Sequence, residues 1–403
     1  MNQEPDVIPS DSTPSPVRYT QFVLKVSKFC NLRCTYCYEM PNLGDRTQFS
    51  RDQLQQLYRN IAPYYRMRAE QDNRPTEIRF IWHGGEPLLV HPAFYWDTFA
   101  DQQEIFGVNQ PIANYVQTNL TVLDDERLRL LREGFAGTGV SLDLYGGLRR
   151  NLAGNDQQTR VLRNMDVLKK ENIPFGCITV LTKKNIGRIK EICEFYARAG
   201  LGFRLLPLFD GAYEDQHQQY EITTQELVQA YQQVVDFWLQ TDRTFAVSPV
   251  RDYIDIVVWH LTEGAGKRYY NKRLFNPALL VNVNGDCYSS GDPYGDPNWC
   301  VGNLFTTSLQ EILMSPQMEK SYTSAERKMA QNCVRCRFFG SCSGFPIVEE
   351  LSNNRERSVE GLPICTVEQY LFEYIEMRLR AAGLPERMPA QVVVQQEMPP
   401  ALA

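Results

Sequence analysis

Short apolar runs alternate with amphipathic stretches from Tyr19 to about Asp210. Six runs have the length and composition of buried strands: Gln21–Val26, Glu77–Trp82, Asn114–Gln117, Gly139–Leu142, Phe175–Leu181 and Phe203–Leu208. Five stretches between them have helical spacing: Arg51–Glu70, after Ser50 as N-cap, Pro92–Phe106, Asp124–Gly134, Gln158–Asn172 and Ile186–Ala199. This alternation predicts an α/β fold with right-handed βαβ units, here a partial (β/α)6 barrel with reactive groups at the carboxyl ends of its strands.

The rest of the chain is divided by composition. Thr223–Thr241 and Asp252–Leu261 again have helical spacing, and most cysteines follow them. We therefore predict a disordered N-terminus (1–18), the partial barrel (19–212), a helical bridge (213–274), a cysteine-rich domain (275–384) and a flexible tail (385–403).

Charge and composition exclude several classes of protein. The net charge of −6 argues against a general nucleic-acid binder. The chain has neither an apolar run long enough to span a membrane nor the apolar core of a signal peptide at its N-terminus. Its 11 cysteines are unevenly clustered, which favours metal ligation over disulfides and a reducing, cytoplasmic setting.

The first cysteine group follows the first predicted strand. Cys30, Cys34 and Cys37 form a C-x3-C-x2-C run with Tyr36 before the last cysteine. Iron–sulfur clusters usually take four thiolates, so three leave one iron open. The run resembles that of the radical S-adenosylmethionine (SAM) superfamily, which implies a [4Fe–4S] cluster whose open iron binds SAM. A zinc loop is the alternative.

Further segments at predicted strand ends extend the resemblance. His83-Gly84-Gly85-Glu86-Pro87 resembles the family's GGEP motif, whose glycines let the backbone approach a ligand closely. Val116-Gln117-Thr118-Asn119 and Ser141 follow at the ends of the next two strands. The resemblance implies SAM contacts by Tyr36, Gly84, Gly85, Glu86, Gln117, Asn119, Ser141 and Arg163, although Arg163 has the spacing of an ordinary surface arginine.

The second cysteine group is Cys333-x2-Cys336-x5-Cys342, followed by Cys365. It resembles the SPASM/twitch-type extension of radical SAM enzymes, which implies that these four hold an auxiliary iron–sulfur cluster; a zinc ribbon is the alternative. The full motif has another cysteine where this chain has Pro346, and Tyr-Pro-Cys where it has Tyr288-Ser289-Ser290. Only Cys287 and Cys300 are then left for a second auxiliary cluster.

The N-terminal half is most similar to maturases that form cyclophanes in ribosomally made peptides. This resemblance implies that SAM is reductively cleaved to a 5′-deoxyadenosyl radical and that an aromatic residue is joined to a nearby side-chain carbon. Asp143, Asp210 and Asp292 are candidate bases by position. The expected partners are a precursor peptide, a flavodoxin- or ferredoxin-type electron donor and a separate leader-binding protein. Sulfatase-maturating-type oxidation, thioether formation and a zinc-stabilised binding protein are the alternatives.

Overall fold

The computed structural model describes residues 19–208, 219–241, 245–274, 278–351 and 354–385. The two predicted terminal tails and Asp210 therefore lie outside the described residues. Within these ranges, one sheet runs through both the predicted barrel and the cysteine-rich part of the chain.

The sheet has ten strands in the order β10-β9-β8-β1-β2-β3-β4-β5-β6-β7. Their bounds are β1 (Tyr19–Ser27), β2 (Glu77–Gly84), β3 (Ile112–Thr118), β4 (Gly137–Ser141), β5 (Phe175–Leu181), β6 (Phe203–Pro207), β7 (Val247–Ser248), β8 (Leu279–Val281), β9 (Asp286–Ser289) and β10 (Cys300–Asn303). Neighbours from β8 through β1 to β7 are parallel, whereas β8, β9 and β10 pair in antiparallel fashion.

All six predicted strands are present, but the predicted sheet was too small. β7 lies inside the segment expected to be a helical bridge, and β8 to β10 extend the sheet beyond β1. The sequence did not reveal β7 because two residues carry no periodicity. The described sheet remains open between β7 and β10, so it is not a closed barrel.

The predicted helices also form, with small shifts at their ends. The α-helices are α1 (Arg51–Asp72), α2 (Pro92–Phe106), α3 (Asp125–Glu133), α4 (Gln158–Lys170), α5 (Ile189–Ala199), α7 (Thr224–Gln240), α8 (Val250–Leu261), α9 (Leu309–Leu313), α10 (Pro316–Asn332), α11 (Phe345–Val348) and α12 (Thr366–Ala381). Short 3₁₀ turns lie at Met40–Asn42, Pro87–Leu89, Ile186–Arg188 and Pro297–Trp299. Ser50 caps α1 as predicted, through a capping box with Gln53.

Apolar side chains between the sheet and the outer helices form the core. Phe22 of β1 stacks on Phe80 of β2, and both are fully buried. Trp82 is also buried, and its indole N–H donates to Asn114 Oδ1 at 2.9 Å, so no polar group is left unpaired there.

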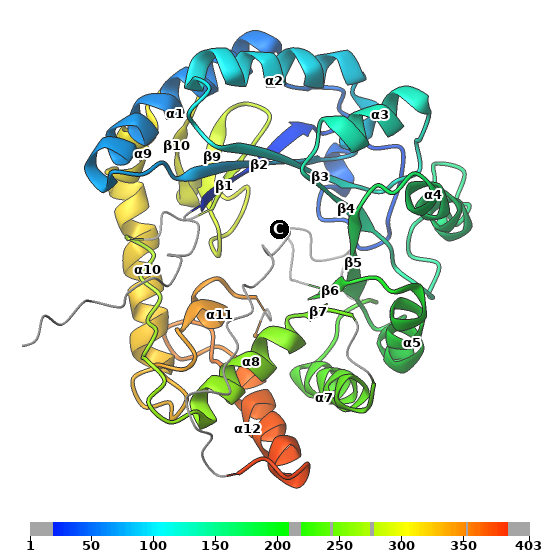
Figure 1. The fold of residues 1–403 in the computed structure, drawn as a ribbon, viewed down its shortest axis with the longest axis vertical. Helices are drawn as coiled ribbons and strands as arrows, with labels where there is room; N and C mark the ends of the chain where they lie inside the picture. Colours follow the sequence, from blue (N-terminus) through cyan, green and yellow to red (C-terminus); the bar gives the residue numbers. More distant parts are fainter. Residues whose placement is uncertain (1–18, 209–218, 242–244, 275–277, 352–353, 386–403) are drawn as a thin grey trace, which may run out of the picture.

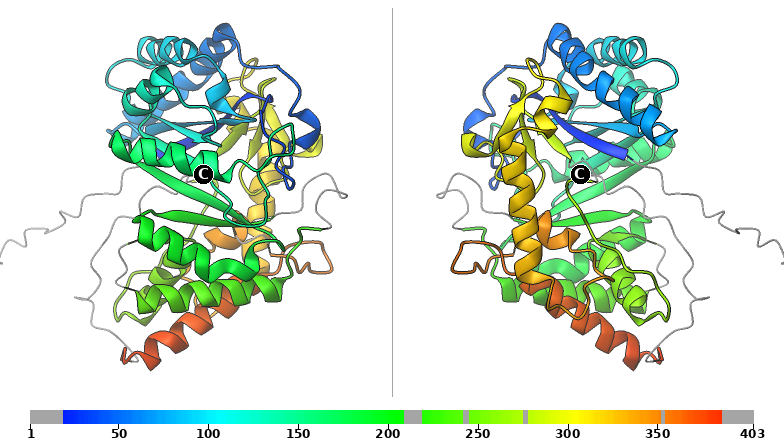
Figure 2. Two further views of the ribbon diagram at one scale, coloured as in Figure 1. Left: turned by 90° about the vertical axis from the view of Figure 1, so that its right-hand side faces the viewer. Right: turned by 90° about the vertical axis from the view of Figure 1, so that its left-hand side faces the viewer.

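The C-terminal elements cover the side that the parallel strands leave open. Figure 1 shows α1 to α5 along the outside of the sheet, with α10 running from the β10 edge towards α11 and α12. α12 packs against α7 and α8, beside the opposite edge of the sheet. The side views in Figure 2 show α10 running from the β10 edge of the sheet to the region of α11 and α12. No helix within the described residues is both long and apolar enough to span a membrane.

Candidate active site

The first cysteine group lies on an irregular loop directly after β1. Backbone bonds fix this loop: Cys30 N–H donates to Leu43 O at 3.1 Å, and Thr35 N–H donates to Leu148 O at 3.0 Å. The thiols of Cys30, Cys34 and Cys37 are close enough to influence one another's ionisation. The loop therefore presents three thiols together, as the spacing predicted.

Burial keeps these thiols protonated in the metal-free chain. It raises the pKa of Cys30 and of Cys34 to about 12, and it also raises the pKa of Cys37. Iron binds the thiolate, so loading a cluster must release these protons. The structure supplies polar neighbours for the sulfurs: Asn119 Nδ2 lies 3.7 Å from Cys30 Sγ, and Arg149 Nη1 lies 3.8 Å from Cys34 Sγ. Such N–H donors stabilise negative charge on cluster sulfurs.

The glycine pair after β2 packs against the cysteine loop. A Cβ at Gly84 would lie 2.3 Å from Ser27 O, and one at Gly85 would lie 2.3 Å from Phe29 O. Gly85 N–H donates to Ser27 O at 2.8 Å. The absence of side chains at Gly84 and Gly85 thus lets the cysteine loop pack directly against the end of β2. Their expected contact with SAM stays a prediction.

Glu86 joins the ends of β2 and β3. Its carboxylate accepts hydrogen bonds from Leu88 N (2.9 Å), Thr118 Oγ1 (2.6 Å) and Asn119 N (2.7 Å), and the residue is buried. A carboxylate has about four acceptor positions, and three are filled from within the protein. Burial, opposed by these donors, raises the pKa of Glu86 above its usual range. The structure thus gives Glu86 a structural contact that its predicted role did not include.

The expected polar groups at the ends of β3 and β4 come together. Gln117 Nε2 donates to Ser141 Oγ at 2.7 Å, and Gln117 is buried over Gly139. Asn119 lies beside Cys30 and also donates to Asn31 Oδ1 at 3.1 Å. By contrast, Arg163 is exposed on α4.

A buried network after β4 contacts the cysteine loop. Asp143 accepts hydrogen bonds from Tyr36 OH and from Val180 N (2.7 Å), and it pairs with Arg149 Nε at 2.8 Å. Arg149 also donates to Tyr36 OH at 2.8 Å and reaches Cys34. Sequence reasoning missed Arg149, because the irregular loop from Leu142 to Gln157 gives no periodicity that would place its side chain.

The second described candidate base, Asp292, lies elsewhere. It is buried beside Lys272, 3.9 Å from its Nζ, and it accepts a hydrogen bond from Ser321 Oγ. Asp143 and Asp292 thus belong to separate buried networks, and the structure does not bring the two carboxylates together at one position.

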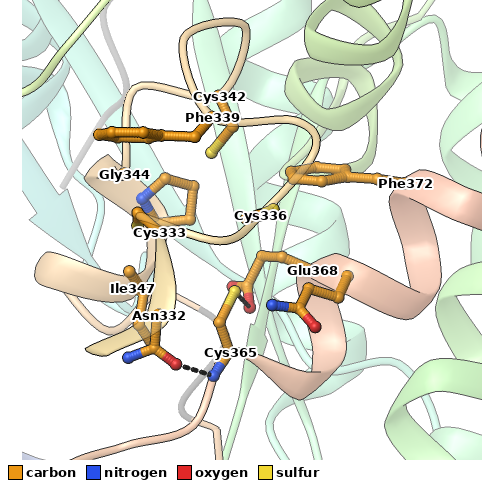
Figure 3. A pocket seen from close by; sticks show the side chains of 12 residues that line it. Asn332, Cys333, Cys336, Phe339, Cys342, Gly344, Ile347, Cys365, Glu368 and Phe372 are labelled. Atoms are coloured by element: carbon orange, nitrogen blue, oxygen red, sulfur yellow. Dashed lines mark hydrogen bonds between the residues drawn. The ribbon is translucent and has the colours of Figure 1, made fainter. Parts of the chain in front are cut away.

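The second cysteine group lines a cavity between α10, α11 and α12. Figure 3 shows the sulfur atoms of Cys333, Cys336, Cys342 and Cys365 around it. The backbone N–H of Cys365 is held by Asn332 Oδ1 at 2.8 Å. Burial raises the pKa of Cys333 and of Cys342 to about 12, so these thiols too must lose protons to bind iron.

A carboxylate that the sequence did not suggest borders this cavity. Glu368 on α12 is buried, and the Cys365 thiol donates to its Oε2 at 3.4 Å. The same oxygen accepts from Asn354 Nδ2 at 2.8 Å. The sequence could have indicated this contact, because Glu368 lies three residues after Cys365 in the first turn of α12.

Cys287 and Cys300 lie apart from that cavity. Both belong to the β9–β10 hairpin, in which Cys300 pairs with Tyr288 and Gly302 pairs with Cys287. Their thiols are near enough for Cys300 to influence the ionisation of Cys287, which is fully buried in the sheet. Within the described ranges, no set of three or more His, Cys, Asp or Glu side chains is spaced around a single metal ion, whereas an iron–sulfur cluster distributes its thiolates over several irons.

Comparison with known families agrees with this arrangement. Residues 24–196 match the model of the radical SAM superfamily, and residues 276–337 match SPASM, an iron–sulfur cluster-binding domain. The chain carries a radical SAM domain followed by a SPASM domain. These domains bind a [4Fe–4S] cluster with SAM and auxiliary iron–sulfur centres, so the resemblance to radical SAM/SPASM enzymes and the cofactor prediction are confirmed. The thiol groups of the radical SAM loop and the SPASM cavity are suited to hold them.

Similarity to characterised relatives extends over most of the chain. The serine-type anaerobic sulfatase-maturating enzyme of Bacteroides thetaiotaomicron is 25% identical over 85% of this chain and 84% of the relative. A cysteine-type counterpart from Clostridium perfringens is 23% identical over 79% of this chain and 86% of the relative.

Solved structures share the same fold. The structure of anSMEcpe with bound AdoMet and the Cp18Cys peptide has a TM-score of 0.69 at 19% identity, over 90% of this chain and 98% of that one. Streptococcus suis SuiB bound to its precursor peptide SuiA has a TM-score of 0.58 at 16% identity, over 88% of this chain and 76% of SuiB. The predicted fold class, a radical SAM core followed by a SPASM domain, is confirmed, with the sheet larger than expected.

Proposed function

We propose that this radical SAM/SPASM enzyme oxidatively modifies a peptide, with the reaction centred on the Cys30, Cys34 and Cys37 loop. The observation that carries the proposal is the number of thiols at the strand ends: three on one loop, beside the polar residues that end β3 and β4. A structural iron–sulfur site normally has four thiolates. A three-thiolate site leaves one iron position for a small molecule.

When bound, the reduced cluster and SAM supply a 5′-deoxyadenosyl radical that removes a hydrogen atom from the substrate. The chain's own residues position and shield this chemistry. Glu86 holds the ends of β2 and β3 together, and Asn119 and Arg149 contact the cysteine sulfurs. Errors of about 1 Å in such positions can cost roughly 10²-fold in rate.

A peptide is the substrate class that the relatives favour. The curated relatives are named as sulfatase-maturating enzymes, and two solved structures of this fold contain peptides. The finer proposal is a cyclophane, in which two C–H bonds break and one C–C bond forms. One hydrogen leaves as an atom to the adenosyl carbon; the second leaves as a proton and an electron. The cavity lined by Cys333, Cys336, Cys342 and Cys365 would hold the electron acceptor.

Sulfatase-type oxidation is the second candidate, favoured by the relatives that cover most of the chain. Oxidation of serine to formylglycine also removes two hydrogens, so mass alone does not separate the two reactions. An aldehyde reacts with a hydrazide probe, whereas a C–C cross-link does not react and blocks fragmentation between the joined residues.

The experiment uses anaerobically reconstituted enzyme, SAM, a reductant and two peptides. One contains a sulfatase-type serine or cysteine; the other is rich in aromatic residues. 5′-Deoxyadenosine should form in the wild type and be absent in the Cys30→Ala/Cys34→Ala/Cys37→Ala variant. A hydrazide-reactive product would refute the cyclophane proposal and support sulfatase-type oxidation. No deoxyadenosine with any reductant, or zinc without iron, would refute the proposed function as a whole.

A further inference from the structure

The SPASM motif departs from the family pattern at two positions, and these lie on segments in contact. Ser290, in place of a cysteine, directly follows β9; Pro346, in place of another, is in α11. Ser290 Oγ donates a hydrogen bond to Glu349, which follows α11. The two positions that lack the expected cysteines therefore lie on segments that contact each other.

The segments are too close to leave room for a cluster between them. Gly291 has φ of +75°, and a Cβ added there would lie 2.8 Å from Val348 O and 3.0 Å from Glu349 Cα. Even one additional carbon does not fit. An iron–sulfur cubane, with its thiolates, is far larger than one carbon.

Buried charges occupy this contact instead. Lys272 Nζ lies 3.6 Å from Glu349 Oε1 and 3.9 Å from Asp292 Oδ2, and it donates to Ser290 O. The side chains of Lys272, Asp292 and Glu349 are 3%, 2% and 4% exposed. Tyr270 OH adds a hydrogen bond to Glu349 Oε1 at 2.8 Å. Buried charges persist only when they are paired and hydrogen-bonded, as these are.

A second lysine joins the same two segments. Lys328 Nζ donates to Gly291 O at 3.0 Å and to Val348 O at 3.3 Å, and it pairs with Glu350 at 2.9 Å. Thus both the β9 side and the α11 side are held by lysines. Because Pro346 and Ile347 of α11 line the cavity of the second cysteine group, this contact also positions one wall of that cavity.

The two remaining thiols, Cys287 and Cys300, do not complete a ligand set for a second auxiliary cluster. Cys287 donates to Gly285 O at 3.3 Å and Cys300 to Gly302 O at 3.5 Å, so each thiol bonds a backbone carbonyl two residues away in the chain. Two thiols are also half the usual cluster ligand set.

We propose that this protein has no second auxiliary cluster, and that the buried network of Lys272, Asp292 and Glu349 replaces it as a structural link. The chain then holds two clusters. One is bound by the loop of Cys30, Cys34 and Cys37, and the other lies in the cavity lined by Cys333, Cys336, Cys342 and Cys365. Lys272 is a positioning residue for α11. This inference does not depend on which bond the enzyme makes in its substrate.

Iron and sulfide counts on anaerobically reconstituted full-length protein test the inference without any peptide. We expect about eight irons per chain, about eight in Cys287→Ser/Cys300→Ser, and about four in Cys336→Ser/Cys342→Ser. About twelve irons in the wild type, or a loss of about four in Cys287→Ser/Cys300→Ser, would overturn it. If that double variant does not fold, Cys300→Ser alone and the wild-type count still decide.

Thermal unfolding tests the network itself. Lys272→Met leaves Asp292 and Glu349 without their shared cation, and we expect a fall of roughly 5 °C in Tm relative to Lys170→Met, an exposed position on α4. Adding Asp292→Asn and Glu349→Gln to Lys272→Met should recover part of this loss, because the unpaired charges are then gone. Equal Tm values for Lys272→Met and Lys170→Met would refute the structural role of the network.

Discussion

Replacing Glu86 by glutamine should loosen the cysteine loop while leaving the shape of the side chain unchanged. The carboxylate accepts three hydrogen bonds, two at Oε1 from Leu88 N and Thr118 Oγ1 and one at Oε2 from Asn119 N. An amide has one acceptor oxygen and one donor nitrogen. If its oxygen keeps the two donors, its NH2 group faces the Asn119 N–H, donor against donor.

The expected cost follows from those contacts. A hydrogen bond to a charged group is worth about 1.5–3 kcal/mol, and a buried N–H left unpaired costs about 1–3 kcal/mol. These two overlap, so we expect Glu86→Gln to lower the free energy of unfolding by about 2–4 kcal/mol. Asn119 also contacts Cys30 Sγ, so its displacement should reduce iron retention at the Cys30 loop.

The assay is denaturant unfolding of the reconstituted protein under anaerobic conditions, with iron counted before and after a chelator wash. Glu70→Gln is the matched control, an exposed position in α1 where a substitution should change stability by about 0.5 kcal/mol or less. If Glu86→Gln matches Glu70→Gln in stability and keeps all its iron, the reasoning about this carboxylate is wrong.

Three further outcomes are expected. Arg149→Lys keeps the charge but cannot hold Asp143, Tyr36 and Cys34 together, so deoxyadenosine formation per iron should fall roughly tenfold; an unchanged rate would contradict this. Burial lowers the pKa of His83 to about 3, so the unfolded chain binds an additional proton below about pH 6.5 and wild-type stability should rise with pH from 5 to 6. His83→Gln should remove up to about 1.4 kcal/mol per pH unit of that slope in denaturation experiments, and equal slopes would exclude a neutral imidazole at this position. Cys365→Ser should lose about four irons while the reductant-driven cleavage of SAM persists; loss of both would mean that the two centres are not independent.

The strands and helices of the core could be predicted because their signal is local. Phe175–Leu181 and Pro92–Phe106 were placed without error, since periodic burial and breaker residues at their ends lie within the segments themselves. β7 and β8 could not be found in this way. Two or three residues carry no period, and their pairing with β6 and β1 depends on segments far away in the chain.

The same division applies to the site. The spacing of Cys30, Cys34 and Cys37 fixed a three-thiol loop, because ligands so close in sequence must share one loop. The sequence also located the glycines and the acid after β2 and predicted that they contact SAM. Only the structure showed that the same residues pack against the cysteine loop and bond the end of β3.

Composition, cysteine spacing and the order of the elements from β1 to β6 were therefore determined by the sequence alone. Only the tertiary structure showed that Arg149 reaches Cys34 across 115 positions, and that Lys272 pairs with Glu349 in a space too small for a cluster. The physical reason is that the partners of a buried charge are chosen by packing. Desolvation makes an unpaired charge costly, but which group pairs with it depends on how distant segments meet.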